Sequence, residues 1–291
     1  MFHGSIPALV TPFKNNALDR DAYVALIERQ IKAGSSGLVP VGTTGESATL
    51  THEEHREAVS LCIETARGRV PVIAGCGSNA TAEAIGLVKH AKKVGADAAL
   101  VVCPYYNRPD QTGLEGHFRS IADAVQMPLI LYNVPSRTSS DLLPETVGRL
   151  AAHPNIVGIK DATGDLARVT EHRVFAGEDF VQLSGDDPSA LGHRAMGGTG
   201  CISVTANVIP ELVANMHKAA DLSDLKTARA LETKLIALHK ALFVSPSPGP
   251  AKYALNKLGL CEADVRLPIT APSAADEAII DEALATAGVE I

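Results

Sequence analysis

The sequence predicts an α/β protein, a (β/α)₈ TIM barrel followed by a C-terminal helical extension. Eight short apolar runs recur along the chain, and each is followed by a polar, glycine-containing turn and a segment of helical period. The runs begin roughly 20 to 34 residues apart, which leaves room for the helical crossovers of a parallel sheet. After about Asp221 the pattern is helical only. A barrel is favoured over an open doubly wound sheet, because no dinucleotide-binding fingerprint follows the first run.

The eight runs are the expected strands. They cover residues 5–10, 37–41, 70–74, 98–102, 128–132, 156–160, 181–184 and 200–203. The boundaries of the helices between them are indicated by a capping box of Thr51 and Glu54, by Thr81 before a run of helix formers, by Pro144 and Pro188 in first turns, and by Gly34 and Gly95 as C-caps.

The last part of the chain has a different pattern. Residues 222–243 are expected to form one long helix, residues 245–250 a linker of Pro, Ser and Gly, and the remainder two shorter helices. We therefore divide the chain into a barrel, residues 1–220, and an extension, residues 221–291.

Composition and charge exclude several classes of protein. Hydrophobic residues make up 46% of the 291 residues and charged residues 20%, which is typical of a globular protein and excludes a disordered chain, a collagen and a coiled coil. The net charge of −7 without a basic cluster disfavours a nucleic-acid partner. No apolar run approaches the ~20 residues of a membrane span, and residues 1–13 do not resemble a signal peptide. Five cysteines without a C-x-x-C pair predict reduced, buried thiols and a cytoplasmic location.

The candidate chemistry lies at the carboxyl ends of the strands, where barrel active sites are found. Lys160 closes an otherwise apolar strand; alone, such a lysine is most simply a snorkelling side chain. Alternation places Gly158 on the same face, where it leaves room for the lysine stem. The preceding expected strand, residues 128–132, ends in Tyr132, and the residues that follow it bring Arg137 to the same end of the barrel.

These side chains suit the attack of a neutral lysine on a ketone, which gives an imine that acts as an electron sink. Burial of Lys160 among apolar neighbours disfavours its ammonium form. The necessary proton shuttle can run through hydroxyls, and Tyr132, Thr43 and Tyr106 supply three. The turn at residues 42–46, Gly-Thr-Thr-Gly-Glu, is rich in N–H groups and hydroxyls and could hold a carboxylate.

Six motifs in order carry a resemblance to a known family. They are Gly-Thr-Thr-Gly-Glu at 42–46, Pro-Tyr-Tyr-Asn-Arg-Pro at 104–109, Tyr-Asn-Val-Pro-Ser-Arg-Thr at 132–138, Gly-Ile-Lys-Asp-Ala-Thr-Gly at 158–164, Leu-Ser-Gly-Asp-Asp at 183–187 and Ile-Ser-Val-Thr-Ala-Asn at 202–207. With them the chain, from Gly4 to about Thr270, resembles the dihydrodipicolinate synthases of the pyruvate-dependent class I aldolase and N-acetylneuraminate lyase superfamily.

The resemblance implies a lyase that condenses pyruvate with L-aspartate 4-semialdehyde in the diaminopimelate route to lysine. It implies that Lys160 forms the imine and that Tyr132 transfers the proton. Thr43 and Tyr106 would complete the relay, with Tyr106 reaching into the site of a neighbouring subunit. The imine would serve in place of a cofactor, and no metal is implied.

The same resemblance implies the binding residues. Thr44 and its turn would hold the pyruvate carboxylate, and Arg137 the carboxylate of the semialdehyde. The backbones of Gly185 and Ile202 would line the pocket. The chain departs from the family pattern at Ser247, where relatives commonly carry Asn, and at Gly249, where they carry a larger aliphatic residue.

Regulation and assembly are implied as well. Free L-lysine would inhibit from a pocket at a subunit interface, and the chain would form a homotetramer arranged as a dimer of dimers, or a dimer. The pocket residues would be Ser47, Ala48, His52, His55, Asn79, Glu83 and Tyr105.

Four alternatives stay open at this point. A sister lyase for N-acetylneuraminate or a keto-deoxy sugar would share Lys160 but usually lacks an arginine at position 137. A phosphosugar aldolase would use Gly-Gly-Thr-Gly at 197–200, which precedes its strand. A metal hydrolase would need more than His52 and His55, whose spacing is i, i+3. A non-catalytic barrel would be expected to lack the lysine or a relay hydroxyl.

Overall fold

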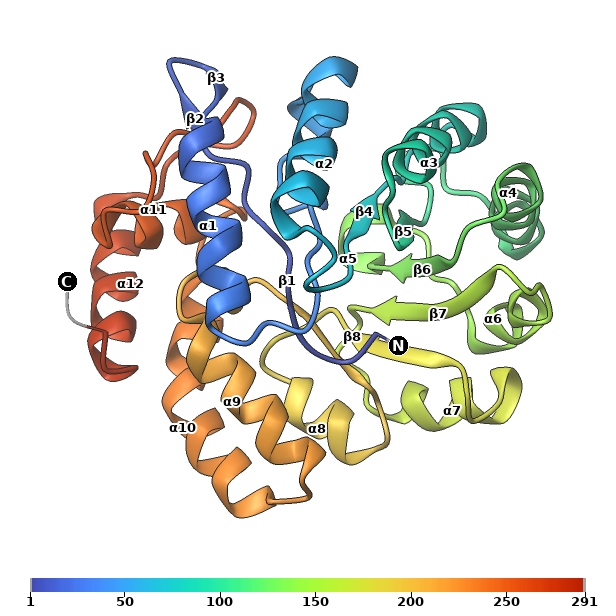
Figure 1. Ribbon diagram of the computed structural model, residues 1–291. Helices are drawn as coiled ribbons and strands as arrows, with labels where there is room; N and C mark the ends of the chain where they lie inside the picture. The colour runs from blue at the N-terminus through green and yellow to red at the C-terminus, as the bar shows by residue number, and fades with distance from the viewer. Residues whose placement is uncertain (1, 290–291) are drawn as a thin grey trace.

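Seven parallel strands form one curved sheet at the centre of the molecule (Figure 1), in a computed structural model that describes residues 2–289. The strands follow the order β1-β9-β8-β7-β6-β5-β4. Their bounds are β1 (Gly4–Pro7), β4 (Ile73–Gly75), β5 (Ala98–Val102), β6 (Leu129–Asn133), β7 (Ile156–Asp161), β8 (Val181–Ser184) and β9 (Gly200–Ser203).

Residues 38–39 occupy the eighth position of the barrel. They form two isolated parallel bridges, Val39 with Ala8 and Leu38 with Val72, where the sequence predicts a strand over 37–41. Pro40 has no N–H to donate, so the regular ladder is interrupted there, although its carbonyl oxygen still accepts from the Gly75 N–H at 3.0 Å. Backbone hydrogen bonds from Leu9 to Val39 and from Ile73 to Leu38 nevertheless complete the ring. The predicted TIM-barrel architecture is therefore confirmed, with a shorter second strand than expected.

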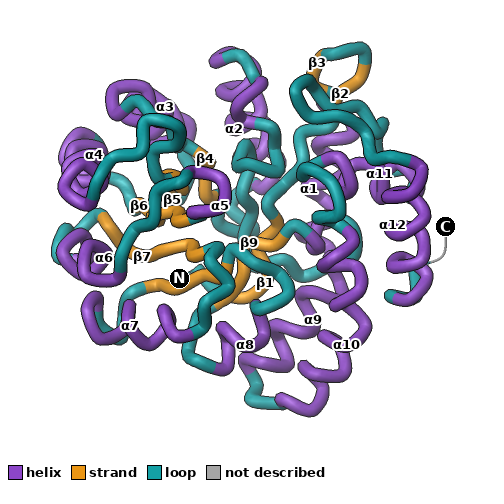
Figure 2. The backbone as a smooth tube through the Cα atoms, turned by 180° about the vertical axis from the view of Figure 1, so that it is seen from behind, coloured by secondary structure: helices purple, strands orange, loops and turns teal. Residues whose placement is uncertain are grey.

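Helices surround the sheet, as Figures 1 and 2 show. They are α1 (Arg20–Lys32), α2 (His52–Ala66), α3 (Thr81–Val94), α4 (Gln111–Ala124), α5 (Pro135–Thr138), α6 (Pro144–Ala151), α7 (Ala167–Ala176), α8 (Ala190–Ala195) and α9 (Pro210–Asp221), with short 3₁₀ turns η1 (Ser47–Thr49) and η2 (Thr205–Asn207). A small hairpin of β2 (Phe13–Lys14) and β3 (Ala17–Leu18) precedes α1.

Three helix boundaries follow the sequence signals. Thr51 and Glu54 form the expected capping box, in which each side chain bonds the other residue's backbone N–H. Pro144 opens α6, and Gly95 closes α3 in the left-handed conformation. These are local features that nearby residues determine.

Two other boundary predictions are confirmed and one is wrong. Thr81 is the first residue of α3, and its hydroxyl bonds Nδ1 of His117 at 2.9 Å. Gly34 closes α1 in the left-handed conformation, directly after Ala33. Pro188 precedes α8 instead of lying in its first turn.

The C-terminal extension consists of α10 (Leu225–Ala241), α11 (Gly249–Lys257) and α12 (Ala274–Thr286). These helices share one hydrophobic core with α9 and with Val10 and Leu26 of the barrel. In Figure 1, α11 and α12 lie beside α1 at the edge of the barrel. The extension is therefore an integral wall of the barrel, and its connecting segments reach the carboxyl ends of the first strands.

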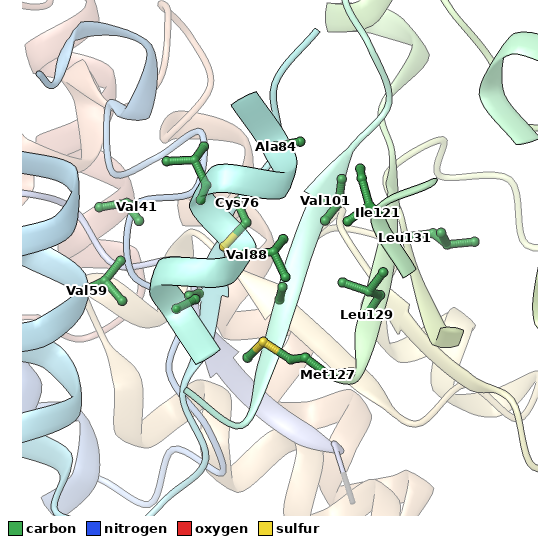
Figure 3. Close-up of a cluster of buried hydrophobic side chains, with 14 of the residues drawn as sticks. Val41, Val59, Cys76, Ala84, Val88, Val101, Ile121, Met127, Leu129 and Leu131 are labelled. Atoms are coloured by element: carbon green, nitrogen blue, oxygen red, sulfur yellow. The ribbon is translucent and has the colours of Figure 1, made fainter. Parts of the chain in front are cut away.

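Two further cores hold the strands in place. The inner one fills the barrel with Ile6, Val39, Ile130, Leu183 and similar side chains. The outer one packs the opposite faces of the strands against the helices, and Figure 3 shows part of it around α3. No helix within residues 2–289 combines the length and the apolar character needed to cross a membrane.

Candidate active site

Lys160 and Tyr132 lie side by side at the carboxyl ends of β7 and β6. The two residues are directly paired in the parallel register. The Nζ atom of Lys160 lies 4.2 Å from the centre of the Tyr132 ring, and each residue is only 6% exposed. The predicted lysine and tyrosine are therefore brought together, with the amine held over the tyrosine ring.

Gly185, at the end of β8, provides the space for the lysine stem. A Cβ atom at this position would lie 2.8 Å from Cε of Lys160. The expectation that Gly158 provides this room is wrong, because a Cβ at 158 would instead meet the carbonyl oxygen of Val181 at 2.6 Å. Gly158 is needed for the close approach of β8.

A cavity of about 460 Å³ opens at this end of the barrel. Tyr132, Thr43 and Arg137 are among its lining residues. So are six of the seven residues predicted to bind lysine, namely Ser47, Ala48, His52, His55, Glu83 and Tyr105. Two candidate catalytic residues, Thr43 and Tyr132, and most of the candidate regulatory residues therefore border one cavity within a single subunit, whereas Lys160 itself is not among its lining residues.

The remaining predicted residues lie outside the lining. Thr44 and Ile202 are buried, and Ile202 belongs to the inner core of the barrel. The Asn79 amide donates to the Tyr105 carbonyl oxygen at 3.1 Å. The Tyr106 ring is 91% exposed, so within its own subunit it does not reach the Lys160 site.

The turn at residues 42–46 is held from two sides. Thr11 donates to the carbonyl oxygen of Gly45 at 2.7 Å. Glu46, in the left-handed conformation, is buried and pairs with Nζ of Lys252 at 2.5 Å. The backbone N–H of Arg266 donates to the other oxygen of Glu46 at 2.9 Å. The extension thus fixes the conformation of the candidate carboxylate-binding turn.

Lys252 and Arg266 are functional supports that the sequence analysis missed. Lys252 is fully buried; burial lowers its pKa, and Glu46 opposes that shift. Arg266 binds both oxygens of Glu54 in α2, at 2.7 and 2.6 Å. The Phe13 ring lies 4.0 Å from Nζ of Lys252 and 4.2 Å from the Arg266 guanidinium. The sequence signal that could have indicated this role is the position of Lys252 among the mostly apolar residues at the start of α11.

His55 presents an unused acceptor. Its Nε2 lies 2.9 Å from the Gly75 carbonyl oxygen and must therefore carry a hydrogen. Burial lowers the pKa of His55 to about 4, so the ring is neutral at pH 7. Its Nδ1 is buried and has no hydrogen-bond partner among the described residues.

Glu83 is the charged group of the same region. It accepts from His52 Nε2 at 2.8 Å and from the Ser78 hydroxyl. The hydrogen bond from Ser78, followed by that from His52, keeps the pKa of Glu83 below its ordinary value despite partial burial. Glu83 is therefore an anionic side chain in the wall of the cavity.

Ser247 and Gly249, where the chain is expected to depart from the family pattern, lie at and beside the wall of the same cavity. Ser247 lines it, with a buried hydroxyl that has no partner among the described residues. A Cβ at Gly249 would lie 2.9 Å from the Thr270 carbonyl oxygen. A larger aliphatic residue would not fit here unless the segment at Thr270 moved.

Comparisons with known proteins point to one family. The model of the Dihydrodipicolinate synthetase family matches residues 1–286. The 4-hydroxy-tetrahydrodipicolinate synthase of Hyphomonas neptunium is 69% identical over 291 residues, which cover 99% of each chain. The pyruvate-complexed dihydrodipicolinate synthase of Acinetobacter baumannii is 44% identical, with a TM-score of 0.97 over 100% of both chains. The lysine-bound enzyme of Cyanidioschyzon merolae is 39% identical, with a TM-score of 0.96 over 99% of both chains.

The expectation from the six motifs is thus confirmed over the whole chain. The activity is that of a 4-hydroxy-tetrahydrodipicolinate synthase, a lyase of the class I aldolase type. The chain belongs to the dihydrodipicolinate synthetase family.

Proposed function

We propose that the chain condenses pyruvate with L-aspartate 4-semialdehyde through an imine on Lys160. The observation that carries this mechanism is the buried Lys160 amine 4.2 Å from the centre of the Tyr132 ring, at the end of the barrel where the cavity opens. The covalent imine performs the work of a cofactor, and no metal enters the reaction.

The first stage attaches pyruvate. The neutral amine of Lys160 attacks the ketone carbon of pyruvate, and the oxygen of the resulting carbinolamine must gain a proton to leave as water. Tyr132 delivers this proton, and the hydroxyls of Thr43 and of a neighbouring subunit's Tyr106 replenish it. Thr44 and the N–H groups of its turn hold the pyruvate carboxylate.

The second stage forms the carbon–carbon bond. The imine loses a proton from the pyruvate methyl group and becomes an enamine, whose carbon attacks the aldehyde carbon of the semialdehyde. Arg137 binds the carboxylate of this substrate with its guanidinium fork. The amino group of the substrate then attacks the imine carbon, which releases Lys160 and closes a six-membered ring. The backbones of Gly185 and Ile202 shape the pocket around the ring.

Substrate choice tests the proposal. We expect turnover with pyruvate and aspartate semialdehyde and none with N-acetylmannosamine. Arg137→Ala should retain imine formation with pyruvate but lose use of the semialdehyde by roughly ten- to more than a hundredfold, since a charged hydrogen bond is worth ~1.5 to 3 kcal/mol. The measurement is kcat/KM for each substrate.

The matched control is Arg229→Ala, an exposed arginine on α10. It should leave both constants unchanged. Preferential turnover of N-acetylmannosamine would instead assign the chain to the sister lyases. Loss of pyruvate trapping in Arg137→Ala, with normal semialdehyde dependence, would reverse the two carboxylate assignments.

We extend the proposal to feedback inhibition by L-lysine. Support comes from the lysine-bound relative and from the acceptors in the cavity wall. Glu83 pairs with the α-ammonium group, and His52 and the free Nδ1 of His55 face the ε-ammonium group. Because Asn79 already donates to the Tyr105 carbonyl, the Tyr105 hydroxyl is the better donor to the ligand carboxylate. Ser47 and Ala48 complete the wall.

Inhibition should respond to Glu83. We expect millimolar L-lysine to inhibit the wild type and Glu83→Ala to need about ten times more lysine or beyond, because a charged hydrogen bond is lost. The measurement is a lysine titration of steady-state turnover. Glu28→Ala, which removes an exposed glutamate paired with Arg69, serves as the control. A wild type indifferent to lysine, or equal inhibition of Glu83→Ala, would remove the regulatory proposal and leave the imine mechanism intact.

We also propose self-association as a dimer of dimers in the cytoplasm. The exposed Tyr106 ring can complete the relay only in another subunit. A second group of exposed apolar side chains, Leu166, Val174, Phe175 and Met196, lies on and beside α7 and α8. Two distinct surfaces are what a dimer of dimers requires. The free, mostly buried thiols fit a reducing compartment.

A further inference from the structure

A polar network lies on the outer side of the Lys160 and Tyr132 strands. The next residue of each strand, Asp161 on β7 and Asn133 on β6, is again paired in the register. Alternation turns these two side chains away from the barrel interior and toward the helix layer. Contacts that hold Asp161 and Asn133 in place therefore also hold the strand ends that carry Lys160 and Tyr132.

Asn133 is bound at both ends of its amide. Its Nδ2 donates to Oδ1 of Asp141 at 2.9 Å, and its Oδ1 accepts from the Leu142 N–H at 3.0 Å. The residue is 0% exposed. Asp141 follows the one-turn helix α5 that carries Arg137, so this contact joins the end of β6 to the Arg137 loop.

Arg168, on α7, joins this group to β7. Its guanidinium binds both oxygens of Asp141, at 2.8 and 2.5 Å, and lies 3.8 Å from Oδ2 of Asp161. Burial alone would raise the pKa of Asp141, but the hydrogen bonds from Arg168 and Asn133 outweigh it and leave this pKa below its ordinary value. The aspartate is therefore a fixed anion at the centre of the network.

Asp161 depends on Arg168 for its charge balance. Its Oδ1 accepts from the backbone and hydroxyl of Thr163, at 2.8 and 2.5 Å. Its Oδ2 is buried and has no hydrogen-bond partner among the described residues. Within that part of the chain, Arg168 is also the only cation within ion-pair distance of it. A buried carboxylate without a cation is costly, so loss of Arg168 should displace Asp161 and the adjacent Lys160.

From this arrangement we infer that Arg168 is a positioning residue for imine formation, which holds the Lys160 amine against Tyr132 through Asp161, Asp141 and Asn133. The inference rests on the proposed function, because it concerns the geometry of the Lys160 reaction. Arg168 itself touches neither substrate nor the reacting atoms. Its effect is to keep the two strand ends in register and the Arg137 loop beside them.

The experiment measures the rate at which pyruvate plus borohydride traps the protein. Arg168→Ala is expected to be trapped about ten to a hundred times more slowly than the wild type at saturating pyruvate, since a displacement near 1 Å costs up to about a hundredfold. Millimolar guanidinium, far below denaturing concentrations, should restore part of the lost rate by occupying the space left by the side chain. If Arg168 only stabilised the fold, added guanidinium would not restore the trapping rate in this concentration-dependent and saturable way.

Arg194→Ala is the matched control. Arg194 is equally buried, pairs with Asp221 and donates to the Gly198 carbonyl at 2.6 Å, near the amino end of β9 and away from the site. We expect this variant to lose thermal stability but to keep its trapping rate, with or without guanidinium. Arg168→Lys serves if Arg168→Ala does not fold. It keeps the positive charge but cannot bind both oxygens of Asp141 as the guanidinium does, so it should be trapped more slowly at nearly normal stability.

Three results would overturn the inference: trapping of the Arg168 variant within twofold of the wild type, an equal loss in Arg194→Ala, or no effect of guanidinium on Arg168→Ala. Failure of the wild type itself to be trapped on Lys160 would instead refute the imine mechanism. The two failures are therefore distinguishable.

Discussion

Replacing Lys160 by methionine is expected to abolish turnover, with a loss in kcat of the order of 10⁶, as when the nucleophile of a covalent mechanism is removed. Methionine is similar in length, so it should fill the space beside Gly185 and pack on the Tyr132 ring with little loss of stability. The measurement is steady-state turnover together with mass spectrometry after pyruvate and borohydride treatment. The wild type should gain a pyruvate-derived mass on Lys160, and the variant should gain none.

A chemical control shows whether the loss of activity comes from the missing amine or from a disturbed site. Lys160→Cys should be inactive and should recover part of its activity after alkylation with 2-bromoethylamine, which builds an amine of nearly the same length. The wild type, treated identically, controls for alkylation of the native thiols, four of which are buried. An adduct on another lysine, or turnover by Lys160→Met, would be incompatible with the imine at this position.

Lys252→Met should strongly destabilise the folded protein, because Lys252 is a fully buried cation of the extension. It leaves the Glu46 carboxylate buried without its cation, and breaking a buried pair in this way costs about 3 to 5 kcal/mol. For a chain of this size we expect the melting temperature to fall by roughly 6 to 20 °C. Calorimetry or thermal unfolding followed by circular dichroism measures the change.

Two variants make this result specific. Lys257→Met removes a lysine of the same helix whose partner, Asp281, is partly exposed, and should change the melting temperature little, because exposed ion pairs contribute little to stability. The double variant Lys252→Met with Glu46→Gln removes both charges and should recover part of the loss. A Lys252→Met protein as stable as Lys257→Met would show that the pair does not support the turn at residues 42–46.

The parts of the fold that the sequence predicted are those that neighbouring residues determine. Strands β5, β8 and β9 have the expected bounds because short apolar runs define them. The pairing of Lys160 with Tyr132 was predictable in outline, since parallel strand ends meet at one edge. The strand at 37–41 was overestimated, because the run is apolar but contains Pro40.

The errors and omissions depend on contacts between distant segments. The alternation of side chains along a strand predicted that Gly158 leaves room for the Lys160 side chain. In the structure Gly158 instead allows the close approach of β8, and Gly185 leaves that room. Arg168 lies on a helix without any motif, and only the folded chain shows that it joins Asp141 to Asp161. The same holds for Lys252 and Glu46, because a single sequence does not show which cation meets a buried carboxylate.

The anchoring of Glu46 by the extension has a consequence for synthesis on the ribosome. Glu46 emerges early, while Arg266, whose N–H it accepts, is 220 residues further along the chain. All the catalytic side chains are therefore translated before the segment that orders the pyruvate turn. We expect a ribosome-bound chain that ends before α11 to contain Lys160 and Tyr132 and yet be inert toward pyruvate. Competence would then be acquired only when translation is almost complete.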